Sequence, residues 1–199
     1  MSSLVLWRHA RTDHNAEGRL QGSLDIPLDA DGRAQAAAAA ARIAAHVGDH
    51  ARVVSSPLAR ATASADELSS LLGVETVVDG AFTQRPYGVW EGLTWDEIRE
   101  RWPEDYDRRH RGEEPFIEGW GSSAHVAARV GEGLRRWYDT EVPTVVVSHG
   151  SAIQLGVLDL VGLDTSSRAF GKIPHGAWHV LTLSDSGAWH VDAFSQGAD

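Results

Sequence analysis

The sequence contains no cysteine. Disulfide frameworks and thiolate metal sites are therefore excluded, and the composition is compatible with a reducing compartment. No apolar run approaches the roughly 18 residues that a transmembrane helix needs. The opening stretch, MSSLVLWRHA, lacks a basic segment and holds only a short apolar run before Arg8, so it does not have the pattern of a signal peptide. We expect a cytoplasmic protein with no membrane partner.

Positive charge is also scarce. Lysine and arginine together number 18, against 28 aspartates and glutamates, and the formal net charge is −10. An acidic surface repels a phosphate backbone, which argues against a nucleic-acid partner. A small anionic substrate would need a local basic pocket within this negative field.

What is present is typical of one globular domain. The chain has 199 residues, of which 42% are hydrophobic and 23% charged. Short apolar runs alternate with helix-forming segments, and this alternation predicts an α/β fold with a largely parallel sheet. The predicted strands cover residues 2–7, 51–56, 74–78, 143–148, 177–183 and 188–194, the last two as a hairpin.

Helices are predicted in the connections between these strands. They cover residues 32–47, 58–72, 95–102, 125–139 and 151–161, with one helical turn at 105–110 inside an irregular stretch, 103–121. Pro57 suits the first turn of the second helix, and Thr94 with Glu97 has the pattern of a capping box before the third. Residues 10–30 and 80–93 are rich in turn formers and are expected to be loops.

Two of the predicted strands are followed closely by a histidine. The first stops at Arg8-His9, and a later one stops at His149. Ligands of open α/β sheets bind beyond the carboxyl ends of the strands, so these histidines are expected to meet at one edge. A third strand leads into a helix with Arg60 near its start, and both arginines and helix N-termini favour phosphate. The residues themselves thus predict an anion site.

The segment LWRHARTDHN resembles the signature of the histidine phosphatase superfamily, which includes the cofactor-dependent phosphoglycerate mutases. The family pattern is Arg-His-Gly-x-Thr-x-x-Asn, and the chain matches it at Arg8, His9, Thr12 and Asn15, with Ala10 in place of the glycine. Later blocks resemble the family in the same order, namely RLQGSLDIPLDADGRAQA (19–36), SSPLARATASA (55–65), YGVWEGLT (87–94) and VVVSHGSAI (145–153).

The resemblance implies a fold and a domain layout. We expect a three-layer αβα sandwich of the phosphoglycerate mutase-like type, with the site at the carboxyl ends of the strands. The whole chain, residues 1–199, is expected to form one such domain. Within it, residues 80–125 are expected to form a cap that partly covers the site.

The resemblance also implies a role for each matched residue. His9 attacks the phosphorus and becomes a phosphohistidine, since a neutral imidazole is a good nucleophile near pH 7. Arg8, Arg60 and His149 surround the phosphoryl group, and further hydrogen bonds come from Thr12, Asn15, Gln21 and the backbone at Gly22, Gly150 and Ser151. Fixed cationic donors stabilise the spreading negative charge, so no metal or cofactor is expected. The spacing of His9 and His14 is not that of metal ligands.

The chain departs from the family at three positions. Gln84 stands where members of this branch usually carry a glutamate that protonates the leaving oxygen. Either another carboxylate serves, with Asp25, Glu91 and Glu118 as candidates by loop location, or the acid is missing. Gln154 stands where an arginine is common. His175 stands where many relatives have asparagine. Its side chain either lies at the rim of the site or takes no part in the site.

These features favour a metal-independent phosphomonoester phosphatase with a small phosphorylated substrate. Mutase-type phosphoryl transfer is the first alternative, because QRPYG resembles the mutase run Glu-Arg-His-Tyr-Gly, although the chain is shorter than typical mutases. A non-catalytic binder of a phosphorylated ligand is the second, because Gln84 replaces the acid. The sequence indicates neither the substrate nor the oligomeric state, and a dimer stays open.

Overall fold

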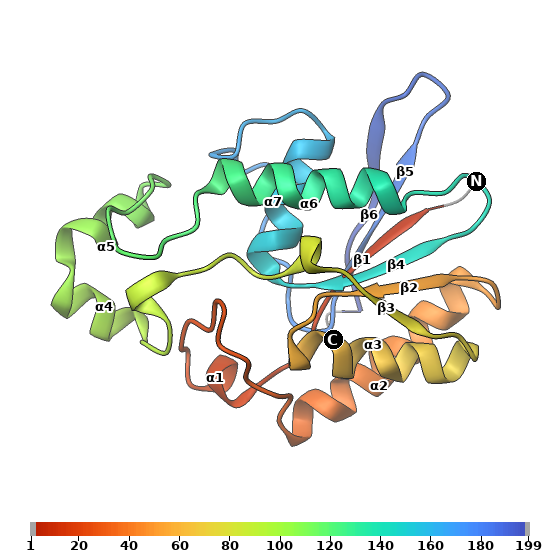
Figure 1. Cartoon of the computed structure of the whole chain (residues 1–199), viewed down its shortest axis with the longest axis horizontal. Coiled ribbons are helices and arrows are strands. Elements are labelled where there is room, and N and C mark those ends of the chain that lie inside the picture. Colours follow the sequence, from red (N-terminus) through yellow and green to blue (C-terminus); the bar gives the residue numbers. More distant parts are fainter. Residues whose placement is uncertain (1–2, 198–199) are drawn as a thin grey trace.

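A six-stranded sheet lies between two pairs of helices in the computed structural model, which describes residues 3–197 (Figure 1). The strand order is β3-β2-β4-β1-β5-β6, for β1 (Leu4–Arg8), β2 (Arg52–Ser55), β3 (Thr76–Val78), β4 (Thr144–Ser148), β5 (Trp178–Leu183) and β6 (Trp189–Gln196). The first four strands of this order are parallel, and β5 and β6 are antiparallel to their neighbours. The carboxyl ends of β2, β4 and β1 therefore meet at one edge.

Helices cover both faces of the sheet. Helices α2 (Ala30–Val47) and α3 (Ala59–Leu72) lie on one face, and α6 (Ser123–Trp137) and α7 (Gly150–Leu160) lie on the other (Figure 1). Successive residues of β1 point to opposite faces, as in any strand. Val5 and Trp7 are buried in a core with residues of α2 and α3, whereas Leu4 and Leu6 are buried with residues of α6 and α7. Burial on both faces explains why the central strands β1 and β4 are continuous apolar runs.

The predicted fold class, layers and mostly parallel sheet are confirmed. All six strands lie where apolar runs indicated them, with ends that differ by one or two residues, as strand and helix ends commonly do. The predicted hairpin is the antiparallel pair β5 and β6. Ser2, which the first predicted strand included, lies outside the described residues.

Three local predictions need correction. Pro57 is not in the first turn of α3, because the helix begins at Ala59 after the N-cap Leu58. The Asp25 carboxylate accepts a hydrogen bond from the Ala59 N–H, 2.7 Å away, and caps the helix at that point. A short helix, α1 (Asp13–Ala16), lies in the predicted loop after β1. The predicted single turn near residue 105 is a full helix, α5 (Pro103–His110).

Helices α4 (Trp95–Arg101) and α5 lie apart from the sheet (Figure 1). The predicted capping box at Thr94 and Glu97 is confirmed and begins α4. A separate small core holds this region together. It contains buried Leu20, Trp90 and Ile98, with Tyr87, Leu93, Trp102, Tyr106, Ile117 and Trp120 packed against them. Two single 3-10 turns, Gly80–Phe82 and Gly88–Trp90, connect it to β3.

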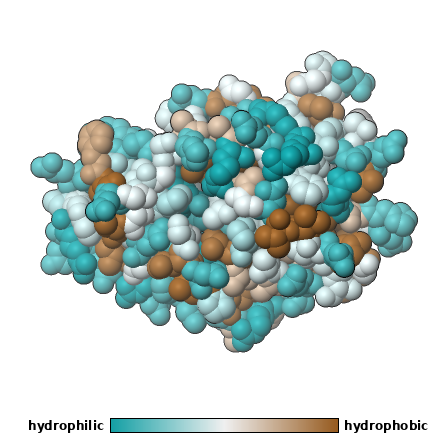
Figure 2. All heavy atoms as spheres, in the orientation of Figure 1, coloured by the Kyte–Doolittle hydropathy of each residue, from teal (hydrophilic) through white to brown (hydrophobic). Residues whose placement is uncertain are grey.

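The visible surface is mostly hydrophilic. Figure 2 shows hydrophobic residues on this face only in small, separated groups. Among residues 3–197, no helix is both long and apolar enough to cross a membrane.

Candidate active site

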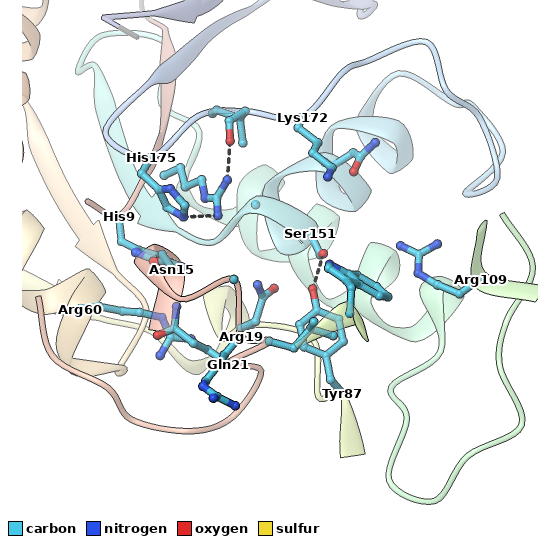
Figure 3. Close-up of a pocket in the computed structure, with 18 residues that line it drawn as sticks. His9, Asn15, Arg19, Gln21, Arg60, Tyr87, Arg109, Ser151, Lys172 and His175 are labelled. Atoms are coloured by element: carbon cyan, nitrogen blue, oxygen red, sulfur yellow. Dashed lines mark hydrogen bonds between the residues drawn. The ribbon is translucent and has the colours of Figure 1, made fainter. Parts of the chain in front are cut away.

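A cavity of about 390 Å³ opens at the carboxyl edge of the sheet (Figure 3). Segments that are far apart in the sequence supply its walls, including the end of β1, the start of α3 and the start of α7. The lining residues are Arg8, His9, Asn15, Gly18, Arg19, Leu20, Gln21, Arg60, Gln84, Tyr87, Trp95, Arg109, Gly150, Ser151, Gln154, Lys172, Ile173 and His175. The volume falls within the range of about 300–1,000 Å³ that is typical of small-molecule sites.

His9 lies directly after β1 and is 2% exposed. Its Nδ1 lies 2.7 Å from the carbonyl oxygen of Ala10, which can only accept a hydrogen bond. Nδ1 therefore carries the proton, and Nε2 keeps a free electron pair. Burial, followed by the positive fields of His149, Arg60 and Arg8, lowers the pKa of His9 well below its usual value. The imidazole is neutral near pH 7.

Arg8 ends β1 and points into the cavity. Its Nη1 donates to the carbonyl oxygen of Ile173 at 2.6 Å, and its Nη2 hydrogen-bonds to Nε2 of His175. Burial lowers the pKa of Arg8 to about 10, so its guanidinium stays protonated at neutral pH. Its buried Nε has no hydrogen-bond partner among the described residues.

Arg60 lies in the first turn of α3 and is fully buried. Its Nη1 and Nη2 donate to the carbonyl oxygens of Leu24 (2.7 Å) and Gly22 (2.9 Å). These bonds fix the orientation of the guanidinium at the cavity wall. Burial lowers the pKa of Arg60 to about 10, and it too remains a cation at neutral pH. Its buried Nε has no hydrogen-bond partner within residues 3–197.

His149 follows β4 and is also fully buried. Its ring centroid lies 5.0 Å from that of His9, so the two histidines meet at one edge of the sheet. Its Nε2 lies 2.8 Å from Oγ of Ser56. Burial and then the fields of Arg60 and Arg8 lower the pKa of His149 well below its usual value, which keeps it neutral. His149 contacts His9 but is not itself among the lining residues.

The structure separates the expected hydrogen-bonding residues into two groups. Asn15, Gln21, Gly150 and Ser151 line the cavity, whereas Thr12 and Gly22 do not. Thr12 caps α1, where its Oγ1 accepts the Asn15 N–H at 3.2 Å, and Gly22 supplies the carbonyl that holds Arg60. Ser151 Oγ lies 2.7 Å from the Tyr87 hydroxyl (Figure 3).

Gln84 lines the cavity from the segment that connects β3 to α4. Its Oε1 accepts a hydrogen bond from the Arg85 N–H at 2.9 Å. The amide group can therefore donate N–H hydrogen bonds, but it has no acidic proton to transfer.

The three candidate substitutes for an acid at this position do not line the cavity. Asp25 caps α3. Glu91 Oε1 accepts the backbone N–H groups of Ser23 (2.8 Å) and Tyr87 (2.9 Å) and thereby joins two loops. Within residues 3–197, no aspartate or glutamate is among the lining residues. The cavity is consequently cationic, in a chain whose net charge is −10.

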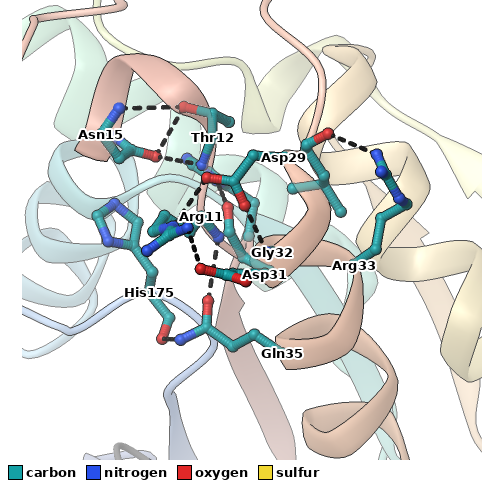
Figure 4. Close-up of polar contacts among 12 residues, drawn as sticks. Arg11, Thr12, Asn15, Asp29, Asp31, Gly32, Arg33, Gln35 and His175 are labelled. Carbon is teal, nitrogen blue, oxygen red and sulfur yellow. Dashed lines mark hydrogen bonds and ion pairs between the residues drawn. The ribbon is translucent and has the colours of Figure 1, made fainter. Parts of the chain in front are cut away.

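His175 lies beside the site, with its ring centroid 5.7 Å from that of His9. Its backbone oxygen accepts a hydrogen bond from Gln35 Nε2 at 2.8 Å (Figure 4). Burial and the field of Arg8 lower the pKa of His175 to about 3. The neutral ring accepts a hydrogen bond from the Arg8 guanidinium, so His175 supports Arg8. Gln154 also lines the cavity and donates to the carbonyl oxygen of Phe170 at 3.1 Å.

A polar network holds the loop after β1 in place (Figure 4). Arg11 Nε donates to Asp29 Oδ2 at 2.8 Å, and Asp29 Oδ1 accepts the Gly32 N–H at 2.6 Å as the N-cap of α2. The Arg11 N–H donates to Gln35 Oε1 at 3.0 Å. Because Gln35 also holds His175, the loop that carries His9 and the loop that carries His175 are both tied to α2.

Sequence reasoning missed several lining residues. Arg19 and Tyr87 fall inside blocks that resemble the family, which was the only available signal for them. Arg109 in α5 and Lys172 before β5 fall in no motif. Within the described chain, no cluster of three or more histidines, aspartates or glutamates is arranged to hold a metal ion.

Comparison with protein families gives a match over most of the chain. The family model described as the histidine phosphatase superfamily (branch 1) matches residues 4–196, which confirms the resemblance. Phosphoserine phosphatase 1 of Hydrogenobacter thermophilus is 34% identical over 83% of this chain and 79% of its own length. Glucosyl-3-phosphoglycerate phosphatase of Mycobacterium tuberculosis is 31% identical over 94% of this chain and 82% of its own length.

Solved structures agree with this result. A mycobacterial glucosyl-3-phosphoglycerate phosphatase in complex with VO3 superposes with a TM-score of 0.88, at 30% identity, over 98% of this chain and 99% of that one. Phosphoserine phosphatase of Entamoeba histolytica in complex with 3-phosphoglyceric acid has a TM-score of 0.87, at 26% identity, over all of both chains. Because these relatives are named as phosphatases, the predicted enzyme class is confirmed at the level of the family.

Proposed function

Because the chain belongs to the histidine phosphatase superfamily, branch 1, we propose that it hydrolyses phosphomonoesters through a phosphohistidine at His9. One observation supports this most strongly. His9 is neutral, with its Nε2 unprotonated, in a cavity whose wall also carries the protonated guanidinium groups of Arg8 and Arg60. A nucleophile beside two fixed cations suits attack on a phosphate ester.

The first step transfers the phosphoryl group to the enzyme. His9 Nε2 attacks the phosphorus, an N–P bond forms, and the bond from phosphorus to the leaving oxygen breaks. The hydrogen bond from Nδ1 to Ala10 holds the ring in place and supports the positive charge that develops on it. Arg8 and Arg60 stabilise the negative charge that spreads over the phosphoryl oxygens. Asn15, Gln21 and the start of α7 at Gly150 and Ser151 add hydrogen-bond donors.

The second step returns His9 to its starting state. Water attacks the phosphorus, the N–P bond breaks, and inorganic phosphate leaves. His149 is neutral and buried against His9, and we assign it the role of a hydrogen-bonding partner of the phosphoryl group in both steps. Thr12 and Gly22 act indirectly, since the first caps α1 and the second holds Arg60.

The leaving oxygen receives no proton from a carboxylic acid in this scheme. By the family resemblance, Gln84 stands in the place of the usual acid, and no carboxylate lines the cavity within the described chain. The leaving group must therefore take its proton from water. Gln84 supplies at most an N–H hydrogen bond to the departing oxygen. We infer that esters with good leaving groups react fastest.

The segment of residues 80–125 contributes Gln84, Tyr87, Trp95 and Arg109 to the cavity wall. We propose that it acts as the cap of a single domain formed by the chain.

The comparisons give no support to a purely binding role. Mutase-type transfer is the remaining alternative, and added bisphosphoglycerate would then interconvert the two monophosphoglycerates. A cytoplasmic location stays a prediction, and the oligomeric state stays open.

A panel of phosphomonoesters assayed with and without a chelator tests the proposal. We expect hydrolysis that the chelator does not change, because the charge is supplied by side chains. We expect His9→Ala to lower turnover by orders of magnitude while vanadate still binds, because Arg8 and Arg60 remain. The proposal would be contradicted if His9→Ala kept turnover within about tenfold of the parent. It would also be contradicted if chelation removed the activity and a divalent ion restored it.

A further inference from the structure

The cavity holds more positive charge than one phosphoryl group uses. Arg8, Arg19, Arg60, Arg109 and Lys172 all line it, and no carboxylate does within residues 3–197. Arg8 and Arg60 belong to the phosphoryl end. Arg19 is already paired, since it donates to Glu17 at 2.8 Å and to Glu97 at 3.1 Å. Arg109 and Lys172 are the two lining cations that neither the phosphoryl group nor a carboxylate of the described chain accounts for.

Lys172 is the only lysine of the sequence. It is exposed at the mouth of the cavity and makes no hydrogen bond or ion pair with the described residues. The next residue, Ile173, accepts the hydrogen bond from Arg8 Nη1. The backbone that carries Lys172 is therefore held directly against the phosphoryl end of the site.

Arg109 approaches the same cavity from α5. Nearby arginines on both sides are paired, since Arg108 (3.4 Å) and Arg111 (2.8 Å) both form ion pairs with Glu113. Arg109 has no carboxylate partner within the described chain, and its guanidinium carbon lies 5.8 Å from the ring centroid of Trp120. Figure 3 shows Arg109 and Lys172 away from the side of the cavity that holds His9 and Arg60.

We propose that Lys172 and Arg109 form a second anion-binding subsite, which selects phosphomonoesters that carry another anionic group, a carboxylate or a second phosphate. The inference rests on the proposed phosphatase function. Two cations from separate segments face one cavity without a protein counter-charge, and Leu20 and Trp95 offer apolar surface to the carbon skeleton between the two ends. Binding energy from this remote group holds the ester in position for attack by His9.

Matched pairs of esters test the selectivity. The compounds 3-phosphoglycerate and glycerol 3-phosphate share a three-carbon skeleton and differ in one carboxylate, while fructose 1,6-bisphosphate and fructose 6-phosphate differ in one phosphate. We expect the more anionic member of at least one pair to have a kcat/KM at least about tenfold higher, as one charge-assisted hydrogen bond provides. We expect Lys172→Gln and Arg109→Gln to reduce this ratio severalfold each. Arg111→Gln, which removes a paired cation outside the cavity, is the matched control and should leave the ratio unchanged.

A binding measurement separates the subsite from the chemistry. Lys172 carries the only side-chain amine of the chain, so Lys172 and the terminal amine are the only amines that an acetylating reagent can label. In the His9→Ala protein we expect the preferred anionic ester to slow acetylation of Lys172 severalfold, whereas its less anionic partner does not. The protection of Lys172 from acetylation should weaken in the double variant His9→Ala with Arg109→Gln. It should persist in the double variant His9→Ala with Arg111→Gln.

The outcomes are distinct for the two claims. If the parent hydrolyses no ester but Lys172 is protected, the proposed function fails and the subsite stands. If the parent hydrolyses both members of each pair with equal kcat/KM and Lys172 is labelled at the same rate with each of them, the subsite is overturned and the phosphatase function stands. A preference confined to the bisphosphate identifies the second anion as phosphate, and one confined to 3-phosphoglycerate identifies it as carboxylate.

Discussion

At the scale of single residues, the site depends on protonation states that burial imposes. His9 and His149 are neutral because their surroundings disfavour a further positive charge. Arg8 and Arg60 remain charged because an arginine whose pKa falls to about 10 still holds its proton at pH 7. One buried cluster thus contains a neutral histidine, which we propose as the nucleophile, and two cations, and phosphoryl transfer through a histidine needs these protonation states.

Gln84 is the residue whose replacement should change the enzyme most informatively. A positioned general acid contributes about 10²–10⁴ in rate, and most where the leaving oxygen is basic. We expect Gln84→Glu to raise kcat for alkyl phosphates far more than for aryl phosphates, and more below neutral pH, where the carboxyl holds its proton. A modest rise in KM is expected from repulsion of the phosphate dianion. Steady-state assays of both ester classes check this, and equal kinetics of variant and parent on alkyl esters would show that another group donates the proton.

His175 is expected to act through Arg8. Its neutral Nε2 accepts a hydrogen bond from Arg8 Nη2, so His175→Ala should leave that donor unpaired and the guanidinium less ordered. We expect vanadate to bind roughly tenfold more weakly to this variant, while its free energy of unfolding changes little. His175→Asn retains an acceptor and should restore most of the affinity. If vanadate binds the alanine variant as tightly as the parent, His175 does not position Arg8.

At the scale of elements, helices α6 and α7 approach closely because glycines face their contact. A Cβ added at Gly156 would lie 2.4 Å from Cγ1 of Val130, and one at Gly131 would lie 1.9 Å from Oδ2 of Asp159. Helix α7 begins with Gly150 and Ser151 at the cavity, so this packing also sets the position of one cavity wall.

We expect Gly156→Ala to lower the free energy of unfolding by about 1–2 kcal/mol. Overpacking against Val130 costs about 1–3 kcal/mol and outweighs the helix propensity of up to about 1 kcal/mol that alanine adds. Denaturant unfolding measures the difference. Gly171→Ala is the control, because nothing lies within 4 Å of a Cβ at that position, and it should stay near the parent value. An unchanged or more stable Gly156→Ala protein would mean that the two helices can separate freely.

The elements also show what a sequence can predict. Buried strands such as β1 and β4 were predictable, because burial on both faces demands continuous apolar runs. Only one turn of helix α5 was predictable, because PEDYDRRH has no apolar period and Tyr106 is its main hydrophobic contact with the small core. The cavity residues Arg109 and Lys172 were missed for a related reason. Their importance comes from the lack of a carboxylate partner, which only the folded arrangement reveals.

At the scale of the whole molecule, the buried histidines connect the site to stability. Their folded pKa values lie below the unfolded value near 6.5, so the unfolded chain binds more protons once the pH falls below about 6.5. Stability conferred by neutral His9 and His149 is present above that pH and is lost as the pH falls toward their folded pKa values. Each group contributes up to about 1.4 kcal/mol per pH unit in this window.

We therefore expect the free energy of unfolding to decrease between pH 7 and pH 5. Urea unfolding in a phosphate-free buffer, followed by tryptophan fluorescence, measures this dependence. The His149→Gln variant should show a shallower slope, since it removes one of the titrating groups. A free energy of unfolding that is constant across this range would show that the histidines titrate normally in the folded protein.

Covalent capture of the intermediate tests the central claim most directly. The protein is mixed with p-nitrophenyl phosphate, quenched in base during turnover, and digested for mass spectrometry. We predict a phosphorylated peptide with the phosphate on His9, and no phosphorylation in the His9→Ala protein. Phosphate found on a different residue would contradict the account. So would turnover by a parent protein that carries no phosphate on His9 at any quench time, if the His9→Ala protein also keeps its activity.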